Sequence, residues 1–221
     1  MKIRNASSFP RDEHLKSTAQ RGKTFLHFSL LLLHCIILLA LVSGCSATYH
    51  AYCKDMVLGR DALKYNDYGA AKRSFEEAYQ NGRSPDALMY LAIIDYKTND
   101  LDSAERLISQ AQGMGVGNYH YLRVLGYKAL ILLKKKSEQG PEALDRYVVF
   151  YSRIDYLMSI EKVKAMLTTG DIDIIRLEKL IEEQVSWYEN DIEQYWSTGT
   201  GWYADKWGGL APIPGPPLCN P

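Results

Sequence analysis

The sequence predicts an all-α fold, in which helical hairpins stack into a solenoid that C-terminal helices close. Three observations favour it. Two segments repeat without a gap at an offset of 33 residues, apolar residues in both recur every three or four positions, and a long amphipathic stretch follows. Because these spacings place side chains on one face of a helix, each segment is expected to bury that face against a neighbour.

The chain begins with a basic flank and an apolar run. Six basic and two acidic residues precede residue 25, and residues 25–42 contain no Lys, Arg, Asp or Glu. At about 1.5 Å per residue the run would span about 27 Å, close to the thickness of a membrane's hydrocarbon core. Val42, Ser43 and Gly44 then lead into Cys45. This pattern predicts an export signal and places the rest of the chain outside the cytoplasm.

The residues Val42 to Cys45 resemble the lipobox of bacterial lipoproteins. The resemblance implies that residues 1–44 are a cleaved signal peptide and that Cys45 carries diacylglycerol and an acyl group such as palmitate. Ser46 follows, where Asp would resemble an inner-membrane retention signal, so we expect the outer membrane, facing the periplasm, in a host with two membranes. An uncleaved signal anchor and a start other than Met1 stay open as alternatives.

The chain from Cys45 onward suits one mildly acidic domain. It has 177 residues, of which 20 are basic and 24 acidic, a balance that argues against nucleic acid as a partner. Cys53 and Cys219 would share a compartment that permits disulfides. The two thiols could bond to each other, become oxidised or pair between molecules, and the sequence leaves these outcomes open.

The repeated segments are residues 57–80 and 90–112, after a linker over 45–54. Each contains a small, a large and a small apolar residue at spacings of four and three: Ala71, Phe75 and Ala78 in the first, and Ala104, Ile108 and Ala111 in the second. With the Leu58-Gly59 pair, this pattern resembles the tetratricopeptide repeat (TPR), a family of helical hairpins. A third, degraded unit begins at residue 119 and contains Leu125-Gly126, and Ala143, Tyr147 and Phe150 of its second helix come later than in the first two units. The predicted repeats therefore extend over 55–151.

Helix boundaries follow from capping residues. Asp67 and Asp100 are expected to cap the second helix of their hairpins, and Ser84 precedes Pro85 at the start of another helix. Residues 152–196 are expected to form capping helices, the first of them stopped by Gly170 and the second running from 171 to 196. An alternative role for the second is to grip a partner. The tail, 197–221, is rich in Trp, Gly and Pro.

The TPR resemblance implies that the inner face of each first helix lines a partner-binding groove. The positions on that face are Met56, Arg60, Lys64, Met89, Ile93, Tyr96, Lys97, His120, Arg123 and Tyr127. Such a lining suits a protein segment with apolar anchors and acidic groups. Charge reversal at Arg60, Lys64 and Arg123 is therefore expected to abolish partner recovery.

No pattern in the sequence predicts catalysis, a metal site or a cofactor. The pair Glu182-Glu183 is interpreted as solvated helix charges. We therefore expect a non-enzymatic adaptor that binds a segment of an envelope protein and supports assembly of a secretion or pilus complex. The alternative is a lipoprotein that binds peptidoglycan or polysaccharide through Trp196, Trp202 and Trp207.

Overall fold

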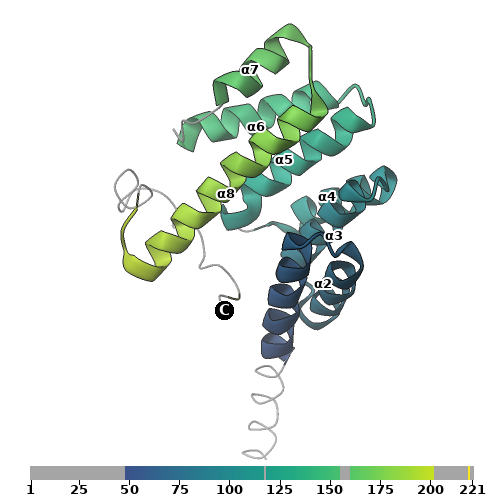
Figure 1. The fold of residues 1–221 in the computed structure, drawn as a ribbon, viewed down its shortest axis with the longest axis vertical. Coiled ribbons are helices and arrows are strands. Elements are labelled where there is room, and N and C mark those ends of the chain that lie inside the picture. Colours follow the sequence, from purple (N-terminus) through teal and green to yellow (C-terminus); the bar gives the residue numbers. More distant parts are fainter. Residues whose placement is uncertain (1–47, 117, 155–159, 202–218, 220–221) are drawn as a thin grey trace, which may run out of the picture. The chain divides into compact units, whose positions relative to one another are not determined.

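The computed structural model describes residues 48–116, 118–154, 160–201 and 219. Every regular element in these residues is an α-helix, which confirms the predicted all-α class for this part of the chain. Figure 1 shows the helices following one another as hairpins, with α8 lying across α5.

The first hairpin joins a helix over residues 48–64 to α2 (Tyr68–Gly82). Gly59 lets the two helices approach closely, because a Cβ atom at this position would lie 2.7 Å from the Phe75 ring. Phe75 is fully buried, and so are Ala71 and Ala78. The predicted small-large-small face of α2 is therefore confirmed as the contact surface.

The second hairpin consists of α3 (Pro85–Lys97) and α4 (Leu101–Met114). All three residues of the equivalent face on α4 are fully buried: Ala104, Ile108 and Ala111. Every residue of α3 from Asp86 to Tyr96 is buried, so α3 is a central helix with neighbours on all sides.

The predicted caps are present at the helix starts. The carboxylate of Asp67 accepts a hydrogen bond from the Ala70 amide at 2.9 Å, and Asp100 does the same for Ser103 at 3.3 Å. Ser84 caps α3 ahead of Pro85. Asn66 has a positive φ of 59° and tolerates this left-handed conformation better than most residues, which explains the Asn-Asp pair at this turn.

The third hairpin consists of α5 (Asn118–Lys134) and α6 (Gly140–Ile154). Its second helix starts late relative to the repeat, as the sequence predicts. Ala143 and Tyr147 are buried as expected, whereas Phe150 is half-buried and packs edge-on against Tyr121.

Two helices complete the described chain. α7 (Ile160–Thr169) ends at Gly170, whose φ is 71°, as the sequence predicts. α8 (Ile174–Thr198) begins three residues later than expected, because Asp173 and not Asp171 caps it with hydrogen bonds from two main-chain amides. α8 packs on α5 at Gly126, where a Cβ atom would lie 2.5 Å from Cγ2 of Ile181.

Candidate binding surface

An acidic row on α8 faces the predicted inner surface of α3 and α5. It consists of Glu178, Glu182, Glu189 and Glu193, whose spacings of four, seven and four place them on one side of the helix. Each of these carboxylates is bound by a side chain from α3 or α5. α8 therefore covers the inner surface as well as the last hairpin.

The Arg123 guanidinium forms the centre of this contact. It donates two hydrogen bonds to Glu189, from Nε at 2.8 Å and from Nη2 at 2.6 Å, and a third to Glu182 at 3.3 Å. His120 Nδ1 lies 3.1 Å from the same Glu189 carboxylate. Arg123 also lies over the Tyr90 ring, 6.0 Å from its centroid. A bidentate pair of this kind fixes both distance and orientation between two helices.

Glu189 remains ionised although it is 7% exposed. Burial by itself raises the pKa of this carboxyl group. The Arg123 charge and the hydrogen bonds from Arg123 and His120 together outweigh burial and lower the pKa to about 2. The pKa of Glu178 is also lowered, because hydrogen bonds from Lys97 and Tyr96 and the charge of Lys97 outweigh its desolvation.

Three tyrosines add neutral donors to the row. Tyr96 donates to Glu178 at 2.8 Å, Tyr127 donates to Glu182, and Tyr119 donates to Glu193. Burial, followed by the neighbouring carboxylates, raises the pKa of all three phenols above their ordinary value. The tyrosines thus remain protonated and hold the carboxylates without adding charge.

This arrangement changes the interpretation of the predicted groove. Six of its ten residues are buried: Met56, Met89, Ile93, Tyr96, His120 and Tyr127. Arg123, Tyr127 and Lys97 face carboxylates of α8 in place of an open channel. Sequence repeats identify the inward face of each hairpin, but they carry no information on which later segment covers it.

The expectation that Glu182 and Glu183 are both solvated holds only for Glu183, which is exposed. Glu182 accepts hydrogen bonds from Tyr127 and Arg123 and lies 3.9 Å from Lys97 Nζ. The repeat and capping patterns of the sequence do not reveal the acidic row. Its signal is the run of carboxylates flanking the apolar positions of α8, which places them at the edges of the buried stripe.

A pocket of about 370 Å³ remains between the helix over 48–64, α3, α5 and α8. It has four cations in its lining, Arg60, Lys64, Lys97 and Arg123, and a single carboxylate, from Glu182. Aromatic rings of Tyr68, Tyr90 and Tyr127 contribute apolar surface. We call this feature the cationic pocket. Its excess of cations over carboxylates favours anionic ligands.

The four cations of the pocket differ in how far they are already neutralised. Arg123 and Lys97 are paired with carboxylates of α8. Arg60 is bound to a neutral group, the main-chain carbonyl of Cys219, at 2.8 Å. Lys64 is exposed and has no ion-pair partner among the residues that the structure describes. Arg60 and Lys64 are therefore the cations on which an acidic ligand would gain most.

The Cys53–Cys219 pairing, which the sequence left open, is a disulfide in the structure, with the two Cα atoms 4.8 Å apart. Cys45, Trp202 and Trp207 lie outside the described residues, as does the apolar run of 25–42. Within the described ranges, no helix is long and apolar enough to cross a membrane, and no cluster of three potential metal ligands occurs.

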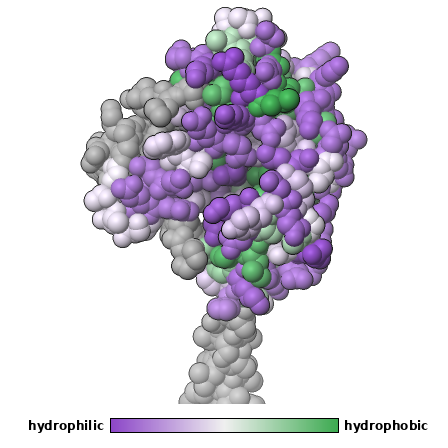
Figure 2. Space-filling model, in the orientation of Figure 1, coloured by the Kyte–Doolittle hydropathy of each residue, from purple (hydrophilic) through white to green (hydrophobic). Residues whose placement is uncertain are grey.

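Most of the face in Figure 2 is hydrophilic, and its hydrophobic patches are small. The exposed large apolar side chains include Tyr65, at 79% in the turn before α2, and two that lie 12 positions apart on α8, Ile175 at 83% and Trp187 at 55%. Single exposed residues of this kind are ordinary on protein surfaces. The pocket is thus the better-defined candidate site.

No protein-family model, no curated protein and no solved structure matches this chain. The resemblance to the TPR family therefore depends on the quoted residues and on the helical hairpins alone.

Proposed function

We propose that this chain is a non-enzymatic envelope lipoprotein with TPR-like helical hairpins, anchored through Cys45. It acts as an adaptor that binds a segment of a partner protein and supports the assembly or stability of an envelope complex, such as a secretion or pilus machine. The family and the anchor rest on the sequence motifs. The single observation that supports a binding role is the cationic pocket, with Arg60 and Lys64 beside an aromatic wall.

The size of the pocket limits what can enter it. At about 370 Å³ it has room for a few side chains. It therefore suits a partner segment that lies across its opening and places one or two carboxylates inside.

The structural role of Arg123 decides which cations to change in a test. Reversal at Arg123 would leave the buried Glu189 carboxylate without its partner and would destabilise the fold itself. The triple reversal suggested by the sequence is thus unsuitable. Arg60 and Lys64 can be changed without disturbing a buried ion pair.

The test is photo-cross-linking in living cells with a reactive amino acid at Lys64. The control places the same group at Lys162, which is exposed on α7 and does not line the pocket. We expect a specific partner adduct from position 64 that the Arg60→Glu substitution removes. Lys54→Glu, an exposed cation on the same helix, should leave the adduct intact. Equal adducts from positions 64 and 162 would exclude the pocket as the binding site.

A further inference from the structure

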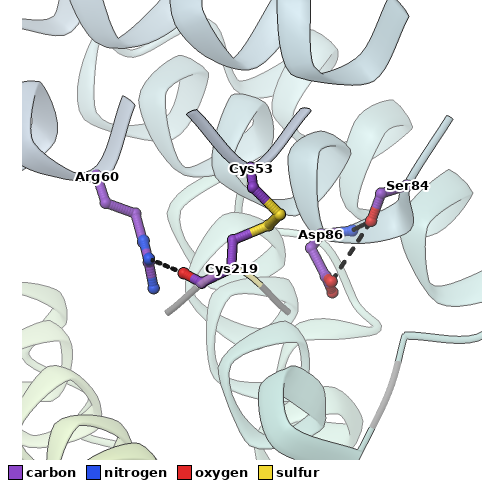
Figure 3. Close-up of a disulfide and its surroundings, with 5 residues drawn as sticks. All are labelled: Cys53, Arg60, Ser84, Asp86 and Cys219. Carbon is purple, nitrogen blue, oxygen red and sulfur yellow. Dashed lines mark hydrogen bonds between the residues drawn. A yellow bond between two sulfur atoms is a disulfide. The ribbon is translucent and has the colours of Figure 1, made fainter. Parts of the chain in front are cut away.

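The disulfide holds Cys219 beside Arg60, a residue that lines the cationic pocket. Cys53 and Arg60 are seven residues apart on one helix, a spacing of nearly two turns that places both on the same side. Cys219 meets both of them, with its sulfur bonded to Cys53 and its carbonyl oxygen 2.8 Å from Arg60 Nη2. Figure 3 shows Cys219 held between the two side chains.

Arg60, a cation of the pocket, donates one hydrogen bond to the uncharged main-chain carbonyl of Cys219. A guanidinium has five N–H donors in a planar fork, and a carboxylate can accept two of them in parallel. The carbonyl of Cys219 accepts one and brings no negative charge. An acidic ligand is therefore a better partner for Arg60, but it must displace the carbonyl before it can accept hydrogen bonds from all the N–H donors of the guanidinium group.

The disulfide determines how strongly the Cys219 carbonyl competes with an acidic ligand for Arg60. Cys219 lies 21 positions after the last residue of α8, Thr198. A covalent link to Cys53 keeps its carbonyl permanently beside Arg60, which gives it a high effective concentration there. Without the link, no covalent bond holds this carbonyl beside Arg60, so its effective concentration there falls.

We infer that the Cys53–Cys219 disulfide is a redox latch on the cationic pocket, and that its reduction frees Arg60 for an acidic ligand. A dithiol reductant supplies two electrons and two protons. Its thiolate attacks the sulfur of Cys53, because Cys53 is a half-buried residue whereas Cys219 is only 6% exposed. The second thiol of the reductant then resolves the mixed disulfide. The products are two protein thiols and the oxidised reductant.

This inference rests on the proposed function of the pocket, and the test separates the two. The full chain is purified in detergent micelles and titrated against a fluorescently labelled peptide of alternating Glu and Val, with binding followed by anisotropy. The oxidised protein is compared with protein reduced by dithiothreitol. We expect reduction to tighten binding about three- to tenfold, the factor that one net hydrogen bond represents.

Two variants and one control variant test whether the effect of reduction arises from the latch. Cys219→Ser should bind like the reduced protein whether or not reductant is present. Arg60→Gln should bind weakly in both redox states, with the effect of reduction lost, whereas Lys54→Gln should behave like the unaltered chain. Helicity measured by circular dichroism checks that each protein is folded, and the comparison of redox states needs no variant at all.

Each outcome of the titration has a definite meaning. Equal affinity in the oxidised and reduced states overturns the latch but leaves the pocket as a binding site. Binding that weakens on reduction also overturns the latch. No measurable binding in either state overturns the pocket's proposed function and the latch together.

Discussion

Arg123 and Glu189 are 66 residues apart in the sequence and form two parallel hydrogen bonds, at 2.8 and 2.6 Å, in a buried part of the protein. The pair joins α5 to α8. Because both charges have left water, the loss of either partner costs more than the pair contributes as a whole. This pair therefore fixes one point of the contact between α5 and α8, next to the buried apolar residues of α8.

The first prediction concerns the charge of Glu189. Glu189→Gln should lower the free energy of unfolding by about 3 kcal/mol, since Arg123 would lose its buried counter-charge and keep only the longer hydrogen bond to Glu182. Urea unfolding followed by circular dichroism measures the change. Glu183→Gln on the exposed side of the same helix is the control and should stay within about 0.5 kcal/mol of the unaltered chain. Equal effects at the two positions would contradict the pairing.

The second prediction is a loss of stability in acid. The folded-state pKa of Glu189 is about 2, below the ordinary value of 4.5, so its contribution is fully present above pH 4.5. As the pH falls from 4.5 towards 2, that contribution, up to roughly 3 kcal/mol, should disappear. The lowered pKa of Glu178 acts in the same direction. Urea midpoints measured between pH 2 and 7 test this, and Glu189→Gln should flatten the dependence.

The third prediction concerns the contact between α5 and α8. Gly126→Ala should destabilise the protein by about 1–3 kcal/mol, because the added methyl group would collide with Ile181. Gly113→Ala on α4 provides a matched control, since a Cβ atom there meets nothing within 4 Å. That substitution should stabilise the helix by up to about 1 kcal/mol. Thermal unfolding of both variants tests whether Gly126→Ala lowers the unfolding temperature and Gly113→Ala raises it.

The fourth prediction concerns the disulfide, which links residues 166 positions apart. Cys219→Ser should lower the free energy of unfolding by about 2–5 kcal/mol, mainly because the unfolded chain gains freedom. Urea unfolding of the unaltered chain with and without dithiothreitol should show the same difference. If dithiothreitol still lowered the free energy of unfolding of Cys219→Ser, the effect of the reductant would not arise from this disulfide.

The sequence alone determined the features that depend on near neighbours. The spacing of Ala71, Phe75 and Ala78 is enough to place them on one helix face. Asp67 marks the start of a helix because its carboxylate can accept a hydrogen bond from a main-chain amide. These signals work because both partners of each interaction lie within one or two turns of the chain. The helical class and the extent of most helices follow from them.

The tertiary structure alone decided what covers the inner surface. Carboxylates such as Glu182 and Glu189 have the same helical spacing whether they face water or a buried arginine, so periodicity cannot distinguish the two. The closeness of Cys53 and Cys219 likewise depends on how the intervening helices pack. Contacts between residues so far apart in the chain depend on how many helices pack together. A short stretch of sequence contains no information on that packing.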